Sequence, residues 1–254
     1  MSKNCKSFQF LIIGSGRGGT SLLAGLLDNH SNIVTGFEMF SRECLLGEKM
    51  GDRNLVKRLF MTKNARIRNR IEAFRAGCCK EAAGHPGRIW GNKITTEHLM
   101  GLRGSPSTGP ADYDAAMKPF FELVFRDTKV LFILRDGRAC VSSKVKRTGQ
   151  PLETACRKWN YSVAVARYLT ERHKHLLVIR FEDLLRKPIE ILSRVCSFLD
   201  VPYEENMIQG TMNDKIPSEY RKDALDVSKA STPYLPEEYF NLIKGNLLYC
   251  GYIS

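Results

Sequence analysis

The sequence predicts an α/β protein with a central parallel sheet and helices on both faces of that sheet. Short apolar runs alternate with longer segments whose apolar residues recur at helical spacing. Strands that alternate with helices in this way build parallel sheets covered on both sides. No internal repeat or linker-like stretch divides the 254 residues, so we expect a single domain over residues 1–254.

The first strand and its turn stand at the start of the chain. Residues 8–13 form a short apolar run, and the glycine-rich turn 14–21 follows at once. Leucines then recur at helical spacing over residues 22–27, which predicts strand, loop and helix in that order. Residues 33–36 are expected to form a second short strand that ends near Glu38.

The second half of the chain repeats the alternation. Residues 101–119 are rich in Gly, Pro and Ser and are expected to form a loop. Beyond this loop, buried strands are expected at 130–134 and 176–181. The helices expected around these strands cover residues 139–147, 155–166 and 189–199.

Positive charge is the unusual feature of the composition. Lys and Arg number 39 against 27 Asp and Glu, a net charge of +12. Residues 42–88 alone contain twelve Lys or Arg against five Asp or Glu, and we interpret this stretch as a basic, mostly helical insertion. Such a balance indicates an anionic partner, which composition does not identify.

From the sequence we expect no membrane span, no signal peptide and no metal site. The apolar runs are far shorter than the roughly 20 residues that cross a membrane. The first residues lack the apolar region of a signal peptide, so we expect a cytoplasmic protein without a membrane span. The eight cysteines are then expected to be reduced, and because Cys78 and Cys79 are adjacent rather than in a CxxC pair, no metal site is indicated.

The glycine-rich turn admits three interpretations. Gly14, Gly16 and Gly19 fit the dinucleotide fingerprint of a Rossmann domain, with Glu38 about 20 residues further on as the ribose-binding acid. The same turn also resembles a nucleotide-triphosphate loop, but Thr20 stands where that loop needs Lys. In the third interpretation Arg17 lies inside a phosphosulfate-binding loop. In all three, free N–H groups at a helix N-terminus favour a phosphate.

A second set of anion-binding residues follows the strand at 130–134. Arg135 begins the next loop, and Ser143 and Arg147 are four residues apart on one face of the following helix. Arg and hydroxyl donors suit a phosphate group. Two phosphate sites at two strand–helix junctions indicate a nucleotide that carries phosphates at both its 5′ and 3′ ends.

Taken together, these motifs resemble the sulfotransferases that use 3′-phosphoadenosine 5′-phosphosulfate (PAPS), and among them the tyrosylprotein sulfotransferase branch. The resemblance covers most of residues 8–207 in consistent order and includes Ser143 and Arg147. The matching segments are GRGGTSL (16–22), LDNH (27–30), GFE (36–38), GNK (91–93), LRDGRA (134–139), KWN (158–160), RFEDL (180–184) and FLDVP (198–202).

The resemblance implies a single P-loop-like domain and a role for each matched residue. Glu38 would be the catalytic base, and Lys93 and Arg17 would neutralise charge at the leaving group. Ser228 and Lys229 would lie in a C-terminal loop that closes over the nucleotide. The loop that cradles the 5′-phosphosulfate would consist of Ser15, Gly16, Arg17, Gly18, Gly19, Thr20 and Ser21. Arg135, Ser143 and Arg147 would bind the 3′-phosphate.

The expected reaction moves a sulfuryl group from PAPS to an acceptor hydroxyl and releases adenosine 3′,5′-bisphosphate without a metal. The acceptor would be tyrosine in an acidic peptide, or a small-molecule or sugar hydroxyl. The sequence leaves the oligomeric state open, with a homodimer as one option. Two alternatives stay open. One is a Rossmann-type NAD(P)-dependent oxidoreductase, and the other is a nucleic-acid-binding protein that uses residues 42–88. His98 is the other candidate base, because it closely follows Lys93.

Overall fold

A five-stranded parallel sheet forms the centre of the protein. The computed structural model describes residues 8–47, 62–102 and 114–254. The strands are arranged in the order β2-β3-β1-β4-β5, and every neighbouring pair is parallel. Their bounds are β1 (Phe8–Gly14), β2 (Ile33–Phe37), β3 (Ile89–Lys93), β4 (Lys129–Leu134) and β5 (Leu176–Arg180).

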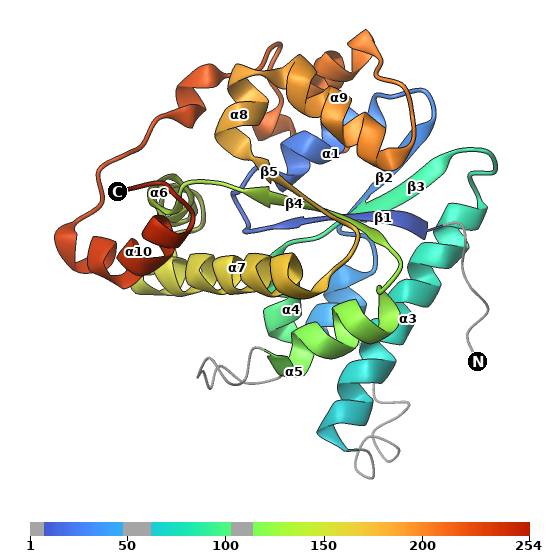
Figure 1. The fold of residues 1–254 in the computed structure, drawn as a ribbon, viewed down its shortest axis with the longest axis horizontal. Helices are drawn as coiled ribbons and strands as arrows, with labels where there is room; N and C mark the ends of the chain where they lie inside the picture. Colours follow the sequence, from blue (N-terminus) through green and yellow to red (C-terminus); the bar gives the residue numbers. More distant parts are fainter. Residues whose placement is uncertain (1–7, 48–61, 103–113) are drawn as a thin grey trace.

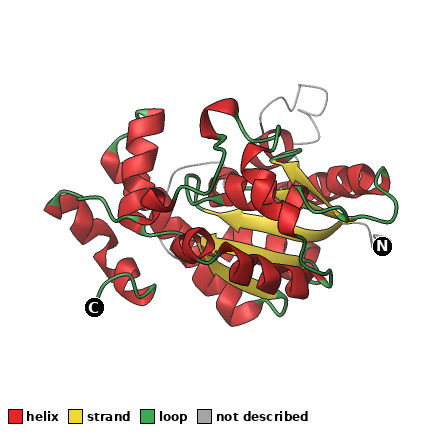
Figure 2. Cartoon of the chain, turned by 90° about the horizontal axis from the view of Figure 1, so that it is seen from above, coloured by secondary structure: helices red, strands yellow, loops and turns green. Residues whose placement is uncertain are grey.

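Helices cover both faces of this sheet (Figure 1). One face packs against α1 (Thr20–Asp28), α8 (Phe181–Arg186) and α9 (Pro188–Leu199), which share an apolar cluster with Phe10 and Ile12 of β1. The opposite face packs against α3 (Lys63–Ala83) and α7 (Leu152–Arg172), and α10 (Glu237–Tyr249) packs in turn against α7. In Figure 2 the strands lie in the middle of the molecule with helices around them.

The shorter elements complete the described chain. The remaining segments are η1 (Ser41–Leu46), α4 (Thr96–Gly101), α5 (Asp114–Met117), η4 (Lys118–Val124), α6 (Gly137–Thr148), η5 (Glu205–Met212), η6 (Ser218–Tyr220) and η7 (Val227–Ala230). Of these, η1 and η4 have the wider π-helical turn, and η5, η6 and η7 are 3₁₀ helices.

The predicted fold class is confirmed. Two local predictions were incomplete. Strand β3 was not expected, and within the stretch 101–119 interpreted as a loop the structure has the short helix α5 and the first two residues of η4, while residues 103–113 lie outside the described residues. Gly91, Asn92 and Lys93 are poor strand formers. Here β1 and β2 pair with β3 on both sides, and a Cβ on Gly91 would lie 2.4 Å from the Phe10 ring.

The strand order separates this fold from the Rossmann alternative. A Rossmann sheet has the order 3-2-1-4-5-6, in which the strand after the first lies beside it. Here β3 lies between β1 and β2. Glu38 therefore follows a strand that is not adjacent to the glycine-rich turn, and the position of a ribose-binding acid is lost.

Other expectations meet the structure only in part. The described portion of the basic stretch 42–88 contains η1 and α3, and residues 48–61 lie outside the described residues. Cys79 is disulfide-bonded, so the expectation of reduced cysteines is wrong there, and Cys5 lies outside the described residues. Within the described ranges, every helix is too short or too polar to cross a membrane.

Candidate active site

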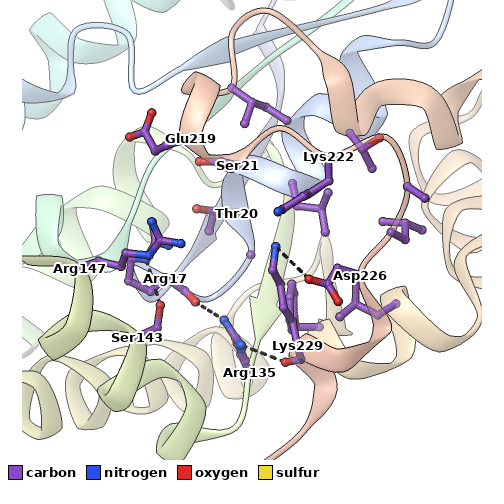
Figure 3. A pocket seen from close by; sticks show the side chains of 18 residues that line it. Arg17, Thr20, Ser21, Arg135, Ser143, Arg147, Glu219, Lys222, Asp226 and Lys229 are labelled. Atoms are coloured by element: carbon purple, nitrogen blue, oxygen red, sulfur yellow. Dashed lines mark hydrogen bonds and ion pairs between the residues drawn. The ribbon is translucent and has the colours of Figure 1, made fainter.

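The candidate site lies at the edge of the sheet where all five strands end. Because the strands are parallel, the segments after β1, β4 and β5 meet at this edge, as ligand sites of open α/β sheets do. A cavity of about 420 Å³ lies there (Figure 3), a size typical of a small-molecule site. Its lining combines the turn after β1 with α6, α8 and the segment 211–229.

The turn after β1 has the geometry of an anion-binding loop. Gly18 donates its N–H to the Ser15 carbonyl at 2.8 Å, and Arg17 has a positive φ of 68°. Gly19 has a φ of 98°, and a Cβ there would lie 2.3 Å from the Phe181 ring, so only glycine fits. Helix α1 begins directly after it at Thr20, and its first N–H groups face the cavity edge formed by Thr20 and Ser21.

The back of this loop is held by a carboxylate. Gly16 donates its N–H to both Glu97 oxygens, at 2.9 and 3.1 Å, and the Lys144 ammonium binds the same carboxylate. Burial alone would raise the pKa of Glu97, but Lys144 and the Gly16 N–H outweigh burial and hold the pKa below its usual value. The ionised pair therefore ties α4 and α6 to the loop.

Removing Lys144 is expected to destabilise the fold. In Lys144→Met the Glu97 carboxylate, only 20% exposed, would lose its counter-charge, and we expect the free energy of unfolding to fall by about 3 kcal/mol. The double variant Glu97→Gln/Lys144→Met removes both charges and should regain most of the loss. Urea denaturation measures the three proteins, and equal stability of the two variants would contradict the proposed role of the ion pair.

Arg135 connects the two anion-binding elements. Its guanidinium donates to the Arg17 carbonyl at 2.9 Å and to the Lys229 carbonyl at 3.0 Å. It also lies over the Phe181 ring, 4.4 Å from the ring centre. Its Nε is buried without a hydrogen-bond partner among the described residues. A buried donor in this state indicates that a ligand can supply the missing acceptor.

Arg17 reaches the second element directly. Its Nε donates to the Ser143 hydroxyl at 3.3 Å, and Arg147 lies beside both in Figure 3. Ser143 and Arg147 are on α6, which follows β4. The turn after β1 and the helix after β4 therefore line the same cavity.

The cavity is strongly positive. Its lining contains five cations, Arg17, Arg135, Arg147, Lys222 and Lys229, and two carboxylates, Glu219 and Asp226. Burial lowers the pKa of Lys229, and the nearby Lys222, Arg135 and Arg147 lower it further, although Asp226 opposes them. A bound anion would stabilise the charged form of Lys229 against these neighbouring cations.

An ion pair lies at the neighbouring strand ends. Lys93 ends β3 and donates from Nζ to Glu38 Oε1 at 2.5 Å, and Glu38 donates its N–H to the Lys93 carbonyl at 2.7 Å. Burial would raise the pKa of Glu38, but Lys93 outweighs it and the pKa is lowered. The Glu38 side chain is 36% exposed, so an ionised carboxylate faces the edge of the sheet beside the cavity.

Comparison with known proteins reveals similarity to sulfotransferases. A family model described as "Sulfotransferase family" matches residues 113–205. The protein-tyrosine sulfotransferase of Drosophila melanogaster is 24% identical over 213 residues, which cover 77% of this chain and 38% of that protein. Protein-tyrosine sulfotransferase A of Caenorhabditis elegans is 25% identical over 214 residues, 78% of this chain and 52% of that protein.

The chain is similar to members of the sulfotransferase family. It is related to the protein-tyrosine branch, and it spans between 38% and 52% of the length of these two relatives. Two solved structures share the fold, each at 19% identity over 94% of this chain. They are the sulfotransferase domain from the Synechococcus PCC 7002 olefin synthase, with a TM-score of 0.63 over 94% of that chain, and the one from the curacin biosynthetic pathway, with 0.60 over 97%.

The structure brings most of the predicted sulfotransferase site residues together. Those that line the cavity are Arg17, Gly19, Thr20, Ser21, Arg135, Ser143, Arg147 and Lys229. The predicted residues outside this lining are Ser15, Gly16, Gly18, Glu38, Lys93 and Ser228. Ser15, Gly16 and Gly18 build the loop from behind, whereas the Ser228 hydroxyl donates to Asp226 at 2.5 Å.

Sequence reasoning missed part of the lining of this cavity. Lys222, Glu219 and Asp226 line it from a polar segment in which no motif stands out. Phe181 was given no role in the site, yet its ring packs on Arg135 and against Gly19. In the described residues, no group of three or more His, Cys, Asp or Glu side chains is placed to hold a metal ion.

Proposed function

We propose that the protein transfers a sulfuryl group from PAPS to an acceptor hydroxyl. The observation that carries the proposal is the five-cation cavity, because it joins the turn after β1 to α6 through Arg17 and Arg135. The unpartnered Arg135 Nε and the excess of cations over carboxylates in the lining fit a nucleotide with two phosphate groups. The nucleotide would supply the sulfuryl group and leave as adenosine 3′,5′-bisphosphate.

Different residues of the cavity would bind different parts of the nucleotide. The N–H groups at the start of α1 and the Arg17 side chain hold the 5′ end, and Arg135, Ser143 and Arg147 hold the 3′-phosphate. Lys229 and Lys222 cover the cavity from the C-terminal segment. Phe181 and the aliphatic residues of the lining offer an apolar wall to the base of the nucleotide.

Glu38 and Lys93 are proposed to act on the acceptor side. Glu38 takes the proton of the acceptor hydroxyl as its oxygen attacks sulfur, and the carboxylate is already ionised because Lys93 lowers its pKa. The Lys93 ammonium and the Arg17 guanidinium stabilise the charge that develops on the departing phosphate oxygen. Lys93 has three donors, so it can keep Glu38 while it binds that oxygen.

The choice of the first acceptor to test rests on the relatives alone. Both curated relatives are protein-tyrosine sulfotransferases, which makes tyrosine in an acidic peptide the first acceptor to test. A sugar or small-molecule hydroxyl is the second. Incubation with labelled PAPS and pools of each acceptor distinguishes them. Cytoplasmic location remains a prediction, and the disulfide at Cys79 is more typical of an oxidising compartment.

Nucleotide binding is the first experiment. We expect adenosine 3′,5′-bisphosphate to bind in a calorimetric titration, and Arg147→Ala to weaken its affinity about 10- to 100-fold, the worth of one charge-assisted contact. Lys146→Ala is the matched control, since Lys146 is an exposed cation of the same helix turn that does not line the cavity. If both substitutions weakened the affinity equally, the loss would come from the change in net charge alone, and the proposed phosphate site at Arg147 would be refuted.

The alternatives predict different titrations. An oxidoreductase would bind NAD(P) in preference to the bisphosphate, independently of Arg147. A nucleic-acid-binding protein would bind an oligonucleotide through the cations of α3, with a steep salt dependence. The same protein sample serves all three measurements.

A further inference from the structure

His98 lies against the proposed base and faces it with one nitrogen. It is on α4, only 5% exposed, and its Nε2 is 3.8 Å from Glu38 Oε2. Lys93 holds the other carboxylate oxygen, Oε1. The two oxygens of Glu38 are therefore flanked by Lys93 on one side and by His98 on the other.

The hydrogen bonds around the ring assign its tautomer. The Thr95 backbone N–H donates to His98 Nδ1 at 3.0 Å, so Nδ1 must be the acceptor and carry the lone pair. In the neutral ring the proton then lies on Nε2, the nitrogen that faces Glu38. A ring in this state has no lone pair toward the acceptor side, which argues against His98 as the base.

Ser41 links the same nitrogen to the backbone of Glu38. The Ser41 hydroxyl donates to the Glu38 carbonyl at 2.6 Å, and His98 Nε2 lies 3.3 Å from the Ser41 oxygen. Because the Ser41 hydroxyl donates its only proton to the Glu38 carbonyl, it can only accept a hydrogen bond from His98. The imidazole Nε2–H is therefore the donor to the Ser41 oxygen. Glu38 has a positive φ of 58°, a strained conformation for a non-glycine residue that such contacts can maintain.

The charges around His98 are compatible with a neutral ring. They are Glu38 from the end of β2, Lys93 from β3 and Glu97 on α4 itself. Burial lowers the pKa of His98 and Lys93 lowers it further, against the attraction of Glu38 and Glu97. Among the neighbouring helices, η1 presents Ser41, and α7 presents Lys158, whose charge interacts with that of Glu97.

We propose that His98 is a positioning residue for Glu38: a neutral imidazole whose Nε2–H holds the Ser41 hydroxyl and faces the second carboxylate oxygen. This role rests on the proposed function of Glu38 as the base. Through Ser41 it orients the carboxylate toward the acceptor, and the positive end of the Nε2–H dipole, 3.8 Å from Oε2, favours the ionised form of Glu38. His98 itself exchanges no proton with the acceptor.

Two substitutions at His98 test this role. Gln can place an amide N–H near the position of Nε2, whereas Leu has a similar volume and no donor. We expect His98→Leu to lower kcat about tenfold or more, to leave bisphosphate affinity within about twofold, and to move the acid limb of kcat to higher pH. His98→Gln should retain most of kcat. Equal losses in both variants, or an unmoved acid limb in His98→Leu, would overturn the role.

A measurement on the nucleotide-free protein separates this inference from the proposed function. With ¹⁵N-labelled histidine and ¹³C-labelled glutamate, NMR at neutral pH should show a neutral His98 with its proton on Nε2, and a higher Glu38 pKa in His98→Leu than in the wild type. If these signals appear but no nucleotide binds, the proposed function fails and the contact stands. A charged ring or a proton on Nδ1 refutes the contact itself.

Ser41→Ala tests the same link should His98→Leu fail to fold. This substitution removes only a hydroxyl, so the acceptor of the Nε2–H and the donor to the Glu38 carbonyl are lost together. We expect a smaller fall in kcat, roughly three- to tenfold, with unchanged nucleotide affinity. An unchanged kcat would contradict the role assigned to His98 through Ser41.

Discussion

Glu38→Gln is expected to lower kcat by about 10²- to 10⁴-fold, the range for loss of a general base. The amide has nearly the shape of the carboxylate but cannot accept the acceptor proton. Glu38 does not line the cation-rich cavity, so the affinity for adenosine 3′,5′-bisphosphate should stay within about twofold of the wild type. Steady-state kinetics with PAPS and calorimetry with the bisphosphate measure the two quantities.

Glu43→Gln is the matched control for Glu38→Gln. Glu43 is an exposed carboxylate of η1, five residues further along the chain. The same loss of charge there should leave kcat unchanged. Retained turnover in Glu38→Gln, or a similar loss in the control, would remove Glu38 as the base and return the question to other residues at this edge of the sheet.

Lys93→Met is expected to reduce kcat by about 10²- to 10³-fold and to shift its pH dependence. The charge-stabilising contact to the departing oxygen is lost. In addition, burial raises the pKa of Glu38 once Lys93 no longer opposes it. The base must be ionised to act, so activity falls as pH drops through the pKa of Glu38. The acid limb of kcat should therefore move to higher pH than in the wild type.

Lys93→Arg distinguishes the two effects of Lys93. A guanidinium keeps the positive charge beside Glu38, so the acid limb should stay near that of the wild type, while its different shape should still lower kcat. The kcat profile from acid to neutral pH measures both variants. An acid limb in Lys93→Met at or below that of the wild type would show that Lys93 does not control the ionisation of Glu38.

Much of the fold could be predicted because the information is local. Residues 8–13 and 130–134 are apolar runs bounded by turn residues, and a buried parallel strand needs little more. The strand β3 could not be found in this way, because Gly91, Asn92 and Lys93 have low strand preference. Pairing with β1 and β2 on both sides stabilises β3, and no local pattern records that pairing.

The candidate site was predictable where its residues belong to a compact motif. Arg17 and Arg135 lie in the turns that follow β1 and β4, and Arg147 lies on α6, the helix after β4. The structure places all three in the lining of one cavity. Lys222 was missed because it comes from a polar segment without a motif. The Glu97–Lys144 pair was missed because its partners are 47 residues apart in sequence and meet only through packing.

The sequence by itself determined the fold class, the anion-binding turn and the residue types suited to phosphate, because strand periodicity and glycine-rich turns act over short distances. Only the tertiary structure decided how these parts combine. The order β2-β3-β1-β4-β5 places Lys93 between Glu38 and the turn after β1, and separates Glu38 from a dinucleotide site. The tautomer of His98 likewise depends on Thr95, Ser41 and Glu38, which share one corner only after the sheet has formed.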